Sequence, residues 1–201
     1  MSPWVATYQH HTALRAGHEH TVERLKAPLR RLAGLRVHCD PSLPWFLKTT
    51  KTDGRTSVFT QPHGEAPGPV RLTALPDLTD ARMSIQATLQ SQTGRLTEFS
   101  AAISGKTAAG VDWTVAIHLE NELRRPAAEG WPGDWRGDGA CGHAIFHCHV
   151  GPDLDAKPKV RVPFLAVGPE HALDWLLTTV VPGFEPMPWG AVNERLVAQR
   201  R

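Results

Sequence analysis

The residues best suited to chemistry in this sequence lie in one short run that contains three closely spaced histidines. Residues 141 to 149 read Cys-Gly-His-Ala-Ile-Phe-His-Cys-His. Side chains alternate between the two faces of a β-strand, which rises about 3.3 Å per residue. As a strand, this run would place Cys141, His143, His147 and His149 on one face and Cys148 on the other. Imidazoles and thiols gathered on one face can bind zinc or iron, or act in acid–base catalysis.

A second segment adds ligands to this face if the two segments pair. From 112 to 120, apolar and polar residues alternate, so His118 and Glu120 point away from Trp113, Val115 and Ile117. Pairing of the two strands would bring His118 and Glu120 onto the histidine face. Two histidines and a carboxylate are a common ligand set at zinc and non-haem iron sites. The candidate metal ligands are therefore His143, His147, His149, His118 and Glu120.

The alternative for these histidines is a polar strand surface that binds no metal. The chain has 11 histidines in 201 residues, and the remaining ones show no common spacing. Metal-ligating histidines usually have a hydrogen-bond partner that orients each ring, and the sequence identifies no such partner. We therefore expect no tightly bound zinc and no cofactor, with zinc or iron on the histidine face as the alternative.

Tryptophans in loop-forming sequence are the second functional feature. Residues 124–139 are rich in proline, glycine and aspartate, which predicts a long surface loop. Trp131 and Trp135 lie in this loop, and Trp189 lies in a proline-rich segment near the C-terminus. Tryptophan is enriched among the residues that dominate protein–protein binding energy. We therefore expect these three residues to contact a protein partner, with indoles that fold back over the core as the alternative.

Two helices are predicted near the ends of the chain. An apolar stripe over 12–33 predicts a basic N-terminal helix that is kinked or divided at Pro28 and ends at Gly34. A second apolar stripe predicts a C-terminal helix from Pro169 to about Val180.

The residue patterns of the segments between the two helices predict β-strands. Residues 35–39 and the two runs that flank Asp53-Gly54 are strand candidates, and the Asp-Gly pair indicates a hairpin. Uninterrupted alternation over 81–121 predicts three consecutive antiparallel strands. Their expected buried residues are Met83, Ile85, Leu89, Phe99, Ile103, Trp113, Val115 and Ile117.

These elements predict an α+β fold in which both helices pack on the apolar face of an antiparallel sheet of about five or six strands. The length fits a single domain over 1–201, and 190–201 is expected to form a flexible tail.

Composition narrows the classes of function. A net charge of +2 argues against nucleic-acid binding, and no apolar run approaches the roughly 20 residues that span a bilayer. The beginning of the sequence does not resemble a secretory signal, and three sparse cysteines indicate reduced thiols in a cytoplasm. The bias toward alanine, arginine, proline and tryptophan suggests a bacterial source.

We therefore expect a non-catalytic protein-binding or accessory module of a bacterial cytosolic system. The alternative is a small metal-dependent enzyme that uses the histidine face.

Overall fold

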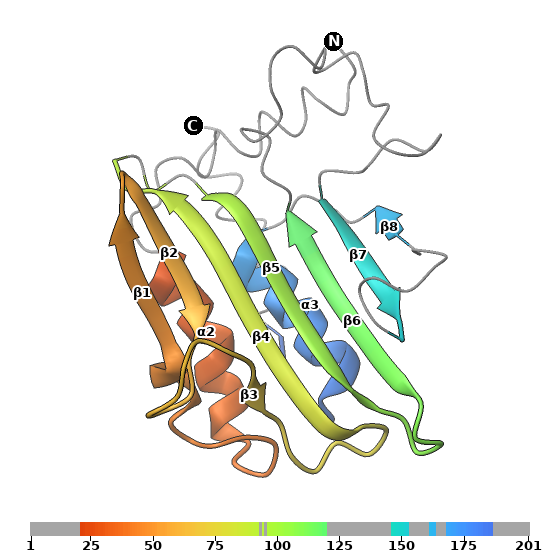
Figure 1. Cartoon of the computed structure of the whole chain (residues 1–201). Helices are drawn as coiled ribbons and strands as arrows, with labels where there is room; N and C mark the ends of the chain where they lie inside the picture. Colours follow the sequence, from red (N-terminus) through yellow and green to blue (C-terminus); the bar gives the residue numbers. More distant parts are fainter. Residues whose placement is uncertain are drawn as a thin grey trace.

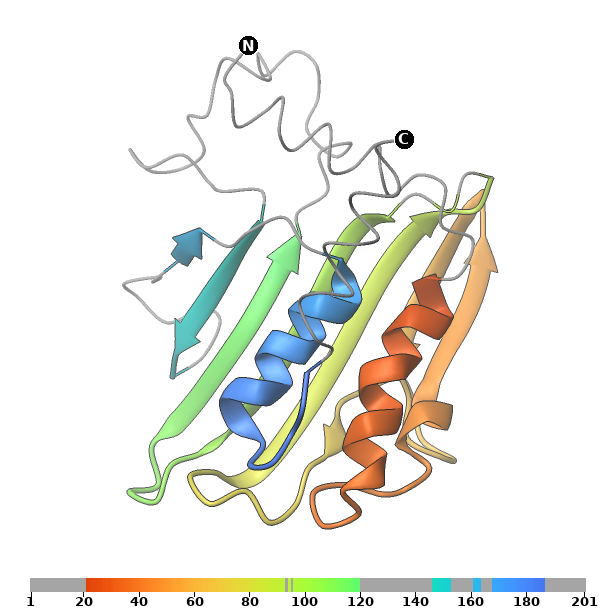
Figure 2. The same cartoon turned by 180° about the vertical axis from the view of Figure 1, so that it is seen from behind.

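Two helices lie on one face of an antiparallel β-sheet. The computed structural model describes residues 21–92, 94, 96–119, 146–152, 161–163 and 168–186. Figure 1 shows the sheet from the face opposite the helices, and Figure 2 shows α2 and α3 side by side on the covered face. This arrangement confirms the predicted α+β class.

The elements follow one another in a simple order along the chain. They are α2 (Thr21–Gly34), the 3₁₀ turn η1 (Leu43–Phe46), β1 (Leu47–Thr52), β2 (Arg55–Thr60), β3 (Val70–Arg71), β4 (Thr79–Gln90), β5 (Leu96–Lys106), β6 (Asp112–Leu119), β7 (Phe146–Gly151), β8 (Arg161–Pro163) and α3 (Pro169–Val180). The strand order is β1-β2-β4-β5-β6-β7-β8, β3 also pairs with β4, and every pairing is antiparallel. Most neighbours in the sheet are therefore neighbours in the sequence.

The apolar stripes of both helices face the sheet. Leu25, Leu29 and Leu32 of α2 are at most 1% exposed. The leucines that α3 buries are Leu173, Leu176 and Leu177. The helix α2 ends at Gly34 as predicted, but Pro28 lies inside it and does not divide it. Packing against the sheet and α3 keeps the helix continuous despite the backbone hydrogen bond that proline cannot make.

The strands β4, β5 and β6 form the predicted meander and hold the centre of the core. Seven of the eight expected residues are buried, and Trp113 is only partly buried. Trp113 is the second residue of β6, next to the turn at the sheet margin, where the covering layer ends. The alternation of the sequence therefore identified the inward face of all three strands.

The segment 35–39 is not a strand, contrary to the prediction. Backbone N–H groups of Leu35 and Arg36 donate to carbonyl oxygens in the last turn of α2, and Arg36 has a φ of 54°. A left-handed residue cannot continue an extended strand. The apolar residues of this segment instead follow the helix end through a series of turns.

The Asp53-Gly54 hairpin is confirmed. Both residues have positive φ, at 47° and 73°, and they connect Thr52 to its cross-strand partner Arg55. Two-residue turns with positive φ at both positions match the right-handed twist of the strands that they join.

Candidate functional site

The histidine strand β7 pairs with β6, as the sequence analysis expected. In the backbone register, His118 lies opposite His147, Ile117 opposite Cys148, and Ala116 opposite His149. Directly opposite residues of antiparallel strands project from the same face. The register therefore places 118, 147 and 149 on one face of the sheet.

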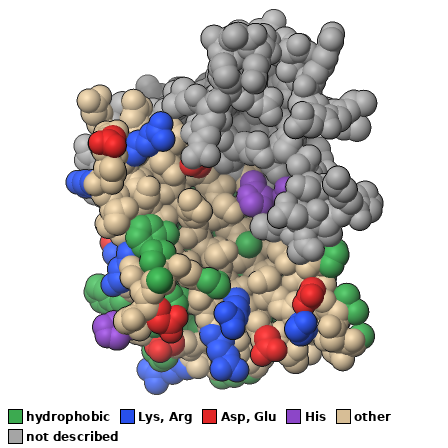
Figure 3. All heavy atoms as spheres, in the orientation of Figure 1, with side chains coloured by type: hydrophobic (Ala, Val, Ile, Leu, Met, Phe, Trp, Pro, Cys, Tyr) green, Lys and Arg blue, Asp and Glu red, His purple; other side chains and the backbone are tan. Residues whose placement is uncertain are grey.

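The side chains of His118 and His149 meet on the sheet face that the helices do not cover. Their ring centroids are 5.0 Å apart and their planes are inclined by 87°. Both residues are half-buried, whereas Ile117 and Cys148, the residues that directly precede them in the sequence, are buried in the core beneath the helices. Figure 3 shows histidine side chains on this face among mainly uncharged polar side chains and backbone. The structure thus brings two of the predicted ligands into contact.

Small residues lie beside the two histidines on this face. Ser100 of β5 is the register partner of His118, and Ala102 is the partner of Ala116. Ala116 is fully buried, and Ala102 is 7% exposed. The imidazoles therefore stand next to short side chains on the β5 side.

The other predicted site residues are not described in the same detail. His143 and Glu120 lie outside the described residues, and His147 is described only by its backbone. Trp131, Trp135 and Trp189, the loop 124–139 and the tail 190–201 also lie outside them. Among the residues that are described, no group of three or more His, Cys, Asp or Glu side chains is placed to hold a metal ion.

Sequence reasoning missed an exposed tryptophan at the opposite side of the sheet. The first of the two strand runs predicted beside Asp53-Gly54 begins at Trp45, but this residue lies in η1 and is 71% exposed. Its backbone N–H donates to Ser42, whose own N–H and hydroxyl donate to the carboxylate of Asp40. These two hydrogen bonds lower the pKa of Asp40. Asp40 and Ser42 thus form a hydrogen-bonded turn that fixes the backbone beneath the indole.

An edge strand begins two residues after this tryptophan. β1 is the terminal strand of the sheet, and only its first residue, Leu47, is buried. Lys48 and Lys51 are exposed along it, and the ammonium nitrogen of Lys26 lies 5.9 Å from the centroid of the Trp45 ring. We call Trp45, Lys26 and β1 the edge surface. The sequence feature that could have identified this surface is the pair Trp45-Phe46, which comes just before a strand of mainly lysines and threonines.

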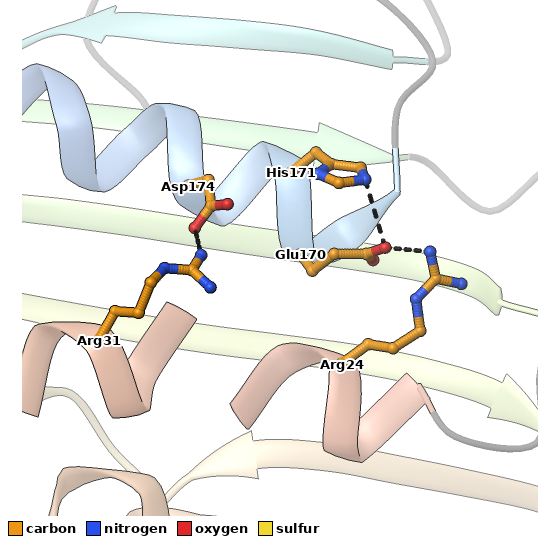
Figure 4. Close-up of polar contacts among 5 residues, drawn as sticks. All are labelled: Arg24, Arg31, Glu170, His171 and Asp174. Carbon is orange, nitrogen blue, oxygen red and sulfur yellow. Dashed lines mark hydrogen bonds and ion pairs between the residues drawn. The ribbon is translucent and has the colours of Figure 1, made fainter. Parts of the chain in front are cut away.

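A buried ion pair joins the beginning of α3 to α2 (Figure 4). Glu170 accepts a hydrogen bond from Arg24 and lies 3.5 Å from Nε2 of His171. The side chain of Glu170 is 4% exposed, and that of Arg24 is 25% exposed. A Cβ at Gly168 would lie 2.6 Å from Oε2 of Glu170, so glycine leaves room for this carboxylate at the helix N-terminus.

A second ion pair joins the same helices one turn further along α3. Arg31 donates to Asp174, whose side chain is 5% exposed. The Nε atoms of Arg24 and Arg31 and Oε2 of Glu170 are buried without a hydrogen-bond partner in the described structure. The two pairs orient the helices relative to each other, but their buried atoms are incompletely satisfied.

The ion pairs change the interpretation of the basic N-terminal helix. Its other two described cations, Lys26 and Arg30, both donate to the exposed carboxylate of Glu23. Those two hydrogen bonds lower the pKa of Glu23 to about 2. Each basic side chain of α2 from 21 to 34 therefore has an acidic partner within the protein.

Cys39 and Cys148 are free, buried thiols. Burial, with a smaller contribution from the charge of Asp40, raises the pKa of Cys39 to about 11, and burial also raises the pKa of Cys148. Both are therefore protonated near neutral pH, where thiols react slowly.

We expect reducing agent to leave the melting temperature unchanged, because Cys39 and Cys148 are free thiols. Titration with a thiol reagent should detect all three cysteines after denaturation without reductant. Cys39 and Cys148 should react slowly in the native protein. Fewer than three thiols in the denatured chain would contradict the prediction.

No family model, no curated protein and no solved structure matches the chain. Among the helices that the structure describes, none is long and apolar enough to cross a membrane.

Proposed function

We propose that this chain is a non-catalytic protein-binding or accessory module of a bacterial cytosol, and that a protein partner contacts the edge surface. The observation that carries the proposal is the 71% exposure of Trp45 on a hydrogen-bonded turn. An indole buried on association contributes a large apolar area, and tryptophan is over-represented in binding hot spots.

The backbone beneath Trp45 supports its role as an anchor. Leu43 and Pro44, which precede it in η1, are both buried. An anchor on a fixed backbone loses less conformational entropy on binding than one on a flexible loop. The edge surface can therefore present the indole without first becoming ordered.

Charge on the edge surface indicates an acidic partner. Lys48 and Lys51 are exposed on β1, and Arg55 is exposed next to the edge surface, at the start of β2. Lysines on an edge strand oppose pairing between identical copies, because like charges would come together. Complementary charge on a different protein would instead favour association and correct orientation.

The ion pairs of α2 weigh against binding of a nucleic acid by this helix. Polyanion binding requires cations that can neutralise phosphates. The basic side chains of α2 are already paired with Glu23, Glu170 and Asp174. The free buried thiols of Cys39 and Cys148 agree with a reducing compartment.

The test is affinity purification of tagged protein from the organism of origin, with Trp45→Ala and Val111→Ala compared with wild type. Val111 is a matched control because it is 57% exposed in the β5–β6 turn, away from β1. We expect one acidic protein to co-purify stoichiometrically with wild type and Val111→Ala but not with Trp45→Ala.

Binding of the purified partner then measures the contribution of the indole. A hot-spot tryptophan contributes about 2 kcal/mol or more, so Trp45→Ala should raise Kd roughly 30-fold. Equal recovery of every bound protein by wild type and Trp45→Ala would refute the role of the edge surface.

A second candidate function, a small metal-dependent enzyme, is favoured by one specific observation. His118 and His149 lie in ring contact on the sheet face opposite the helices. Such an enzyme requires a bound metal, and metal binding is measurable separately from catalysis.

A further inference from the structure

We infer that His118 and His149 together bind a divalent transition-metal ion, with zinc as the reference ion. The inference deepens the second candidate function by naming its metal class, but the binding of the ion does not depend on catalysis. It concerns the face of β6 and β7 opposite the helices and is independent of the edge surface.

The separation of the two rings matches that of two ligands of one ion. Zinc lies about 2.0–2.1 Å from a ligating ring nitrogen, with roughly 109° between ligands in a tetrahedral site. With about 1.2 Å more from each nitrogen to its ring centre, two ligating imidazoles have centroids roughly 5.2 Å apart. The observed separation of the His118 and His149 centroids is 5.0 Å. The spacing of the two ring centroids is therefore that of two imidazoles that bind one ion.

The backbone that carries the two histidines is well fixed. β6 is paired on both sides, with β5 and with β7, and β7 is also paired with β8. Ile117 and Cys148, the neighbours of the histidines in sequence, are buried in the core. Sites on paired strands hold their ligands more accurately than sites on loops. Strand pairing thus fixes the backbone from which both imidazoles project.

The donor type selects the class of ion. Imidazole nitrogen suits zinc, copper, iron and nickel, whereas magnesium and calcium prefer oxygen ligands. Two protein ligands leave other coordination positions for water or further residues. We therefore expect an exchangeable site, which is compatible with the sequence-based expectation that zinc is not held tightly.

The experiment is calorimetric titration of chelator-treated full-length protein with zinc chloride and, separately, with magnesium chloride. Wild type should bind one zinc ion at this site and no magnesium. Loss of even an outer-shell partner weakens metal sites about 10–100-fold, so His118→Asn and His149→Asn should each weaken this zinc-binding step at least roughly tenfold. Zinc should also raise the melting temperature of wild type more than that of either variant.

His38→Asn is the matched control, because His38 lies after α2 and its ring hydrogen-bonds to the carbonyl oxygen of Thr73. It should bind zinc like wild type. Circular dichroism and the metal-free melting temperature must show that each variant is folded, and the more conservative His→Gln changes provide a second pair of variants.

Zinc binding that is unchanged in the folded His118 and His149 variants would overturn the site, because the ion would then bind elsewhere in a chain with 11 histidines. Absence of zinc binding by wild type would overturn it as well. Neither result affects the edge surface, and zinc binding without any activity would retain the site while removing support for the enzyme.

Discussion

Replacement of Arg24 by methionine should be among the most destabilising single changes in this protein, with a loss of about 3–5 kcal/mol in the free energy of unfolding. The change removes the partner of Glu170, whose side chain is 4% exposed. A buried carboxylate without its ion-pair partner retains the cost of desolvation and loses the attraction that offsets it. His171, at 3.5 Å from Glu170, is the nearest remaining cationic group in the described structure, and only when protonated.

Removal of the acidic partner should lower the free energy of unfolding less than removal of Arg24. Glu170→Met leaves Arg24, whose side chain is 25% exposed and can turn its guanidinium toward water. The double variant Arg24→Met, Glu170→Met should recover much of the loss, because apolar side chains of similar volume often replace a buried ion pair without destabilisation.

Urea denaturation of the two single variants and the double variant completes a thermodynamic cycle for this pair. Lys26→Met is the matched control on the same helix, because its partner Glu23 is exposed. Exposed ion pairs contribute about 0–1 kcal/mol. If Arg24→Met is no more destabilising than Lys26→Met, the Arg24–Glu170 pair does not matter for stability.

Ile117→Ala should lower the free energy of unfolding by about 2–5 kcal/mol, through lost burial and the cavity that remains. Ile117 is fully buried at the centre of β6, between Ala101 of β5 and Cys148 of β7. These neighbours have small side chains and sit in paired strands, so they can do little to fill the space.

The measurement is urea unfolding with a slope that matches wild type, which would indicate that only stability has changed. Gln86→Ala is the control because Gln86 is exposed on the other face of β4, and such surface changes usually stay within about 0.5 kcal/mol. A loss at Ile117 as small as that at Gln86 would show that Ile117 is not part of the packed core.

The local pattern of the sequence determined which elements form and which face each one buries. Alternation in 81–121 identified the inward residues of β4, β5 and β6, because successive side chains of a strand point to opposite faces whatever covers them. The Asp53-Gly54 pair similarly specified its hairpin, since few residues tolerate positive φ at two consecutive positions. The sequence did not by itself predict that β6 pairs with β7. It predicted only that His118 and Glu120 would join the histidine face if the two strands paired.

Only the tertiary structure decided which distant groups meet and which remain exposed. Arg24 and Glu170 are 146 residues apart, and no local period connects them. Cys39 and Trp45 both follow α2, yet the first is buried and the second is 71% exposed. The contact of His118 with His149 likewise depends on the register between β6 and β7. The alternation of apolar and polar residues determines which face of a strand is buried. Which residues of different elements then touch depends on how the whole chain packs.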